Sequence, residues 1–185
     1  GQAIVVLLFT GLRIGELLAL TWNDIDFNDR TIDVNKNAVV APINTENKTN
    51  YVLINQNSTK THSGNRIIPM SDPAYDALQS IYKINGDKKY VMSSSNGKQI
   101  TPRNINRMFH SILKQTGIAT TADEQCGVHT LRHTFASMLF KNGEEVKTVS
   151  ELLGHSDTKI TENIYIHLIH KQKVKAIQGL NNLLK

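Results

Sequence analysis

Apolar and polar residues alternate with helical spacing along most of the chain. Residues 5–9 form an apolar run that predicts a buried first helix, and residues 14–20 continue as a second short helix after a break near Gly11. The inward-facing side chains of the second segment are expected to be Leu17, Leu18 and Leu20.

A longer helix is predicted where a start signal precedes apolar residues at helical spacing. Ser71 or Asp72 caps this helix, Pro73 occupies its first position, and Asn85 and Gly86 end it. Its buried face is expected to consist of Ala74, Ala77, Leu78 and Ile81.

Further helices follow in the second half of the chain. Thr101 and Pro102 repeat the start signal, and residues 129–142 and 146–153 form two more helical segments, each ended by a glycine. The helix after Pro102 carries an apolar face made of Ile105, Met108, Phe109, Ile112 and Leu113. A final amphipathic segment carries Val174, Ile177, Leu180 and Leu184.

Strand signals are few and short. Residues 31–34 alternate and predict a strand, whereas the polar residues 43–50 predict a loop. Residues 51–54 and 66–69 are interpreted as the two arms of a hairpin, with Lys60 on the way to its tip. The pattern therefore predicts an α+β fold that is mostly helical with a small antiparallel sheet, in one domain over residues 1–185.

Composition narrows the function only mildly. The net charge of +5 favours a polyanionic partner, although ordinary surface solvation explains it equally well. The single Cys126 excludes an internal disulfide and a cysteine-based zinc site, and it suggests a reducing cytoplasm. No apolar run approaches the roughly 18 residues that cross a bilayer, so we expect no membrane partner.

Two pairs of residues carry candidate chemistry. Arg13 and Glu16 are three apart, which predicts a shared helical face, and an ordinary surface ion pair is the alternative. His129 and Arg132 share the same spacing on a helix whose apolar stripe lies elsewhere, so both are expected to face a ligand. The planar fork of arginine suits two phosphate oxygens.

Histidine and tyrosine residues add further candidates, each with an alternative. His129 and His133 at i, i+4 would suit zinc, but the pattern lacks the glutamate of the zinc hydrolase motif and places a cation beside the ion. His155 follows Gly154 at a junction of helix and loop, where a structural capping role is the ordinary interpretation. Tyr165 is either a core tyrosine or a nucleophile.

The local text around these residues resembles the tyrosine recombinases, the phage-integrase family. The segments that carry this resemblance are "TGLRIGELLALTW", "TKTHSGNRIIP", "HTLRHTFAS", "LLGHSD" and "TENIYIH". The resemblance implies that Tyr165 is the nucleophile, that Lys60 protonates the leaving 5′ oxygen, and that His129 is the candidate base. It also implies transition-state contacts from Arg13, Arg132 and His155, supported by Glu16.

The same resemblance implies the partners and the setting. Members act on double-stranded DNA with specific recombination sites, as homotetramers, without a metal, a cofactor or ATP, while the isolated domain is expected to be monomeric. An excisionase or a host DNA-bending protein is a further expected partner. The chain is expected to begin after the core-binding and arm-binding domains, and to come from a bacterial or phage-encoded protein acting at the nucleoid.

Two alternatives remain beside site-specific recombination. A type IB topoisomerase or telomere resolvase would use the same chemistry with a different outcome. A catalytically inactive DNA-binding accessory of the same fold would have lost a tyrosine or an arginine, whereas here the whole set is present.

Overall fold

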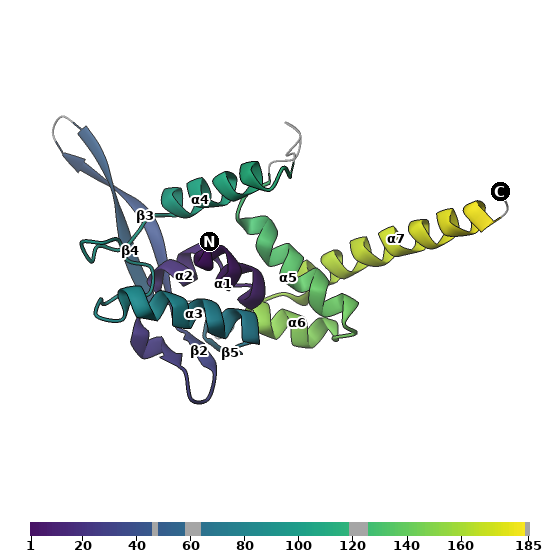
Figure 1. Cartoon of the computed structure of the whole chain (residues 1–185), viewed down its shortest axis with the longest axis horizontal. Helices are drawn as coiled ribbons and strands as arrows, with labels where there is room; N and C mark the ends of the chain where they lie inside the picture. The colour runs from purple at the N-terminus through teal and green to yellow at the C-terminus, as the bar shows by residue number, and fades with distance from the viewer. Residues whose placement is uncertain (46–47, 58–63, 119–125, 184–185) are drawn as a thin grey trace.

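Helices form most of the fold, as the hydrophobic spacing predicts, and two small antiparallel sheets accompany them (Figure 1). The structure is a computed structural model that describes residues 1–45, 48–57, 64–118 and 126–183. In these ranges the helices are α1 (Gln2–Thr10), α2 (Ile14–Ala19), a 3₁₀ turn (Trp22–Asp24), α3 (Asp72–Asn85), α4 (Pro102–Gln115), α5 (His129–Lys141), α6 (Val146–Leu153) and α7 (Thr158–Leu183). The α+β class is thus confirmed.

The sheet with more strands joins three short ones in the antiparallel order β1–β2–β5. Its strands are β1 (Ile25–Asp26), β2 (Thr31–Val34) and β5 (Arg66–Pro69). Ile32 pairs with Ile68 and both are buried, which fixes the register because a shift by one residue would turn them to the opposite face. The first residue of β5 is thereby held beside α6, which contacts this strand.

The second sheet is a long two-stranded hairpin that projects from the body of the molecule (Figure 1). β3 (Lys36–Thr45) pairs with β4 (Lys48–Asn57) along the whole length of both strands. Val40 and Ile54 lie on opposite faces of the ribbon and are 51% and 41% exposed, so much of the ribbon meets solvent on both faces. Exposure of this kind explains why polar residues are tolerated in these strands.

Two predictions about this region are wrong. Residues 43–50 were expected to form a loop, but they include the ends of β3 and β4. Residues 51–54 were expected to pair with residues 66–69, but they lie in β4 and pair with β3, while β5 pairs with β2. The alternation of side chains carries little burial signal in a solvated ribbon, so the sequence pattern could not assign the partners.

Helix ends follow the sequence signals closely, with shifts of one to three residues: α1 extends beyond the predicted residues 5–9 at both ends, and α2 and α5 each end one residue early. Gly143 (φ 92°) and Gly154 (φ 64°) lie just beyond α5 and α6, as expected for residues that end helices in the left-handed region. α4 begins at its predicted cap. α3 begins one residue earlier than predicted, because Ser71 is the cap, Asp72 is the first helical residue and Pro73 is the second.

The core consists of two apolar clusters. The larger one lies among α1, α2, α3, α4 and the three-stranded sheet, and it contains the predicted inward-facing residues of α2 and α3. The smaller one joins α5 and α6, and Ile164 and Leu168 of α7 pack against it; its buried residues are Phe135, Ala136, Phe140, Val149 and Leu153. Within the described ranges, no helix is both long enough and apolar enough to cross a membrane.

Candidate active site

Arg13 caps α2 instead of lying on its exposed face. Its backbone is extended (φ −69°, ψ 149°), and its N–H donates to Oε2 of Glu16 at 2.8 Å. Its guanidinium donates to Oε1 of Glu16 at 2.9 Å and to the carbonyl oxygen of Gly154 at 3.3 Å. The Arg13 side chain remains 40% exposed, so it is anchored and still open to a ligand.

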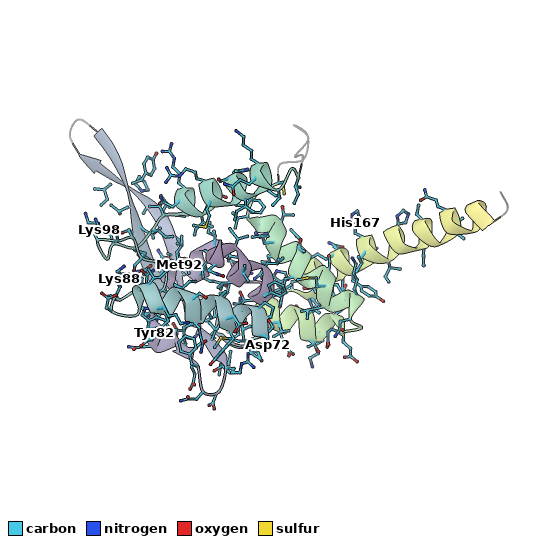
Figure 2. The ribbon with its side chains drawn as sticks, viewed as in Figure 1. Asp72, Tyr82, Lys88, Met92, Lys98 and His167 are labelled. Atoms are coloured by element: carbon cyan, nitrogen blue, oxygen red, sulfur yellow. The ribbon has the colours of Figure 1, made fainter. Side chains whose placement is uncertain are left out.

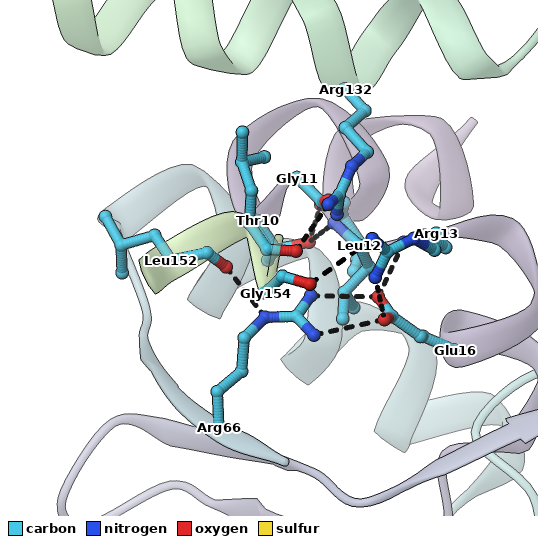
Figure 3. Close-up of polar contacts among 11 residues, drawn as sticks. Thr10, Gly11, Leu12, Arg13, Glu16, Arg66, Arg132, Leu152 and Gly154 are labelled. Carbon is cyan, nitrogen blue, oxygen red and sulfur yellow. Dashed lines mark hydrogen bonds and ion pairs between the residues drawn. The ribbon is translucent and has the colours of Figure 1, made fainter. Parts of the chain in front are cut away.

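Arg132 on α5 is buried, although the apolar stripe predicted that it would face a ligand. It is 4% exposed, and its guanidinium donates to the carbonyl oxygens of Gly11 and Leu153 (Figure 3). Gly11 approaches α5 closely because it lacks a Cβ, which would lie 2.4 Å from Cδ1 of Phe135. Burial, followed by the charge of Arg13, lowers the pKa of Arg132, but the guanidinium stays protonated at neutral pH.

Glu16 joins two cations through one buried carboxylate. Besides Arg13, it accepts hydrogen bonds from Nη1 and Nη2 of Arg66 at 3.0 and 2.9 Å (Figure 3). Burial raises the pKa of Glu16, but the hydrogen bonds and charge of Arg66, followed by those of Arg13, outweigh burial and hold this pKa below its ordinary value. The resulting stabilisation is present above the ordinary carboxyl pKa and is lost as pH falls through the depressed one. We call Arg13, Arg66 and Arg132 the arginine cluster.

His129 opens α5, and its imidazole lies edge-on to that of His133, with ring centroids 5.1 Å apart. Burial, followed by the charges of His133, Arg132 and Arg13, lowers the pKa of His129. A neutral imidazole is able to accept a proton at neutral pH, as a general base must. Among the described residues, no group of three or more His, Cys, Asp or Glu side chains is placed to hold a metal ion, so the zinc alternative gains no support.

His155 follows Gly154 directly and therefore lies at the end of α6. Its Nδ1 is 2.9 Å from Oγ1 of Thr161, a fully buried residue of α7. The capping of α7 falls to Asp157, whose carboxylate accepts the N–H of Lys159 at 2.9 Å. Burial, followed by the charges of the arginine cluster and then of a neighbouring histidine, lowers the pKa of His155 to about 4.

We expect the His155 imidazole to stay neutral in the DNA-free protein until the pH falls to about 4. The unfolded chain binds the same proton near 6.5, so this residue makes the fold less stable as pH drops from that value toward the folded pKa. NMR of the imidazole resonances as a function of pH measures the titration, with the denatured chain as control. A folded-state titration near 6.5 would contradict the expectation.

Tyr165 lies on α7 away from the arginine cluster. Its ring packs edge-on against Phe140, with centroids 5.2 Å apart. Phe140 is eight residues beyond Arg132 on α5, about 12 Å along the helix axis at 1.5 Å per residue. Since Tyr165 is also 39% exposed, it is not the fully buried core tyrosine of the alternative interpretation.

A mostly apolar pocket of about 530 Å³ lies between α5 and the first turns of α7. His167, which lies at the start of the projecting part of α7, is one of its lining residues (Figure 2). The others are His133, Ser137, Ile160, Asn163, Ile164 and Leu168. The helix that carries Tyr165 is therefore not packed tightly along the whole of α5.

Two residues complete the comparison of the site with the sequence. Lys60 lies outside the described residues. Arg66, the first residue of β5, was not predicted as a site residue, although its side chain is only 7% exposed and contacts Glu16. It lies inside the segment that carries the resemblance, but its partner is fifty residues away, so local spacing could not identify it.

Comparisons with known proteins assign the chain to a family. The sequence model of the phage integrase family matches residues 2–172. The chain belongs to the phage integrase family. Among curated relatives of this integrase domain, a tyrosine recombinase XerC-like protein of Caldanaerobacter subterraneus is 36% identical over 198 aligned positions, which cover 98% of this chain and 49% of that protein. The integrase of Staphylococcus phage L54a is 28% identical, covering 98% of this chain and 51% of that protein.

Solved structures share the fold of this integrase domain. The Tn1549 transposon integrase in complex with a circular intermediate DNA matches with a TM-score of 0.72 and 31% identity, over 89% of this chain and 53% of that one. The XerA recombinase, at 24% identity and a TM-score of 0.66, shows the fold alone. The integrase domain spans about half the length of the curated relatives it matches. The predicted family and its catalytic-domain fold are thus confirmed.

Proposed function

We propose that this integrase domain cleaves and rejoins specific DNA sites through a 3′-phosphotyrosine intermediate. The observation that carries the proposal is the convergence of Arg13, Arg132 and His155 at the end of α6. Two fixed guanidinium groups and an imidazole suit the charge that builds on a phosphate during transfer. Family membership and the DNA in the complexes of a related integrase support DNA as the substrate.

In the proposed reaction, the Tyr165 hydroxyl gives its proton to His129 while its oxygen attacks the phosphorus. The bond from phosphorus to the 5′ oxygen breaks, and this oxygen takes a proton from Lys60. The 5′-hydroxyl of the partner strand then attacks the phosphotyrosine and releases Tyr165. The bond energy is retained in the intermediate, so the reaction needs no ATP, and guanidinium groups take the place that a metal ion would have in stabilising the charge on the phosphate.

The proposal requires α7 to move, because the ring of Tyr165 now packs against Phe140. The pocket between α5 and α7 supports such a shift, since it leaves space beside the helix turn that carries the phenol. A phenol with a pKa of about 10 also needs a positive field before it attacks at neutral pH. The arginine cluster supplies that field once the phenol approaches it.

The tail supports assembly on DNA as a homotetramer. α7 projects from the body beyond its first turns (Figure 1), and Val174 and Ile177 on it are 43% and 60% exposed. Packing of this apolar surface on a neighbouring copy would bury it and would draw α7 away from its present position. Within the same proposal, an excisionase and a host DNA-bending protein assist the tetramer, and the isolated domain is monomeric.

A nicked suicide duplex tests the proposal, because loss of the cleaved fragment traps the covalent intermediate. The full-length protein is incubated with the duplex in the presence of a chelator and without nucleotide. We expect a protein–DNA species that survives denaturation and is destroyed by protease. Binding is also expected to weaken as salt rises, since contacts to phosphates dominate affinity.

The other outcomes of this experiment identify the alternatives. Binding without any covalent species would favour a DNA-binding accessory and would refute the proposal. A covalent species that relaxes supercoiled DNA but never joins two duplexes would favour a topoisomerase of the same chemistry.

A further inference from the structure

Arg66 is a buried arginine whose donors are used within the protein. Its Nε donates to the carbonyl oxygen of Leu152 at 2.7 Å, while Nη1 and Nη2 hold the two oxygens of Glu16 (Figure 3). Both Nη groups of Arg66 are taken up by a carboxylate, whereas the side chain of Arg13 stays 40% exposed and Arg132 donates to neutral carbonyl groups, so Arg66 has the least charge to offer to DNA. Its two-pronged contact with a carboxylate fixes both partners in direction as well as in distance.

The arginine cluster is anchored on three successive carbonyl groups of one helix. The carbonyl of Leu152 accepts from Arg66, that of Leu153 from Arg132, and that of Gly154 from Arg13 (Figure 3). Carbonyl groups in the last turn of a helix lack partners inside the helix, and they carry the negative end of its dipole. The end of α6 thus holds three cations side by side.

Charge balance makes this arrangement depend on Arg66. In the described part of the chain, Glu16 is the carboxylate that forms ion pairs with the arginine cluster, and it pairs with Arg13 and Arg66. Without Arg66, the buried Glu16 would keep Arg13 as its one guanidinium partner, and the Leu152 carbonyl would lose its donor. Both changes displace groups that bind the scissile phosphate under the proposed function.

We infer that Arg66 is a positioning residue for DNA cleavage, which aligns Arg13 through Glu16 and holds the end of α6 for Arg132 and His155. This inference rests on the proposed function. Arg66 does not touch the phosphate, so its removal acts on the reaction rate more than on DNA affinity. Misplacement of a reacting group by about 1 Å costs up to about 10²-fold in rate.

A set of variants of the full-length protein tests the inference by single-turnover cleavage of the suicide duplex at saturating protein. Arg66→Met is expected to slow cleavage by about 10²-fold, and Arg66→Lys by less, because lysine keeps the charge but not the fork. Arg30→Met is the matched control, since Arg30 forms an exposed ion pair with Asp72 and stacks on Tyr75. It is expected to cleave at the wild-type rate.

A double variant separates positioning from a general effect on folding. In Glu16→Gln/Arg66→Met the buried carboxylate is neutralised, so we expect a rate no lower than that of Arg66→Met alone. The inference would be overturned if the rate losses of the single variants Glu16→Gln and Arg66→Met multiplied in the double variant. It would also be overturned if Arg66→Met cleaved at the wild-type rate. If Arg66→Met does not fold, Arg66→Lys carries the test, and cleavage by this variant at the wild-type rate would overturn it too.

A DNA-free measurement distinguishes failure of this inference from failure of the proposed function. The NMR titration of His155 is expected to move to higher pH in Arg66→Met and to stay unchanged in Arg30→Met, because one of the charges that oppose its protonation is removed. An unchanged His155 titration in Arg66→Met overturns the positioning role. Absence of covalent product from the wild-type protein, with the shift present, overturns the proposed function instead.

Discussion

Replacing Tyr165 with phenylalanine is expected to abolish the covalent protein–DNA species while preserving the fold. The phenolic oxygen is the proposed nucleophile, and removal of a nucleophile from a covalent catalyst lowers its rate by on the order of 10⁴-fold or more. Stability should change little, because a phenylalanine ring keeps the edge-on contact with Phe140. The suicide duplex on a denaturing gel measures the product, and a mobility shift measures DNA binding, which is expected to be retained.

Tyr82→Phe is the matched control for this experiment. Tyr82 is 48% exposed on α3, and its ring packs edge-on against Trp22 and Phe27. The same oxygen is removed there, yet covalent product is expected at the wild-type level. Persistent covalent product from Tyr165→Phe would show that another residue attacks the phosphorus.

Replacing Arg132 with methionine is expected to cause the second large loss. Removal of one donor that stabilises a developing charge costs on the order of 10²–10³ in rate. The substitution also leaves the carbonyl oxygens of Gly11 and Leu153 without this donor, at about 1–3 kcal/mol for each buried group left unsatisfied. Single-turnover cleavage and urea unfolding measure the two effects separately.

Arg132→Lys distinguishes charge from geometry at this position. Lysine keeps a positive charge on α5 but has no planar fork to reach two carbonyl groups at once, so we expect part of the rate and part of the stability to return. Arg30→Met, which loses an exposed ion pair, is expected to lose no more than about 1 kcal/mol and no rate. A normal cleavage rate in Arg132→Met would remove this residue from the proposed mechanism.

Local signals predicted the helical part of the fold well. The start at Thr101 and the stop at Gly154 depend on backbone preferences of a few neighbouring residues, and the structure has both. Strand pairing depends on distant partners, which is why residues 51–54 were matched with the wrong strand.

The site shows the same division. Family resemblance singled out Arg13, Glu16, His155 and Arg132, and the structure brings these residues together around the end of α6. It could not show that Arg132 is buried or that Arg66 shares Glu16, because both facts arise from packing between segments far apart in the sequence. The position of Tyr165 against Phe140 likewise depends on how α7 lies on α5, which spacing along one helix does not determine.

The three carbonyl groups that anchor the arginine cluster at the end of α6 also have a mechanical consequence. Residues 154–157 are all that separates α6 from the long helix that carries Tyr165, and His155 in this short link is tied to Thr161. We therefore expect a pull on α7 to reach the last turn of α6, where the three guanidinium groups are bound. Under the proposed assembly, a neighbouring subunit that binds α7 would move the Tyr165 phenol and shift the arginine cluster at the same time.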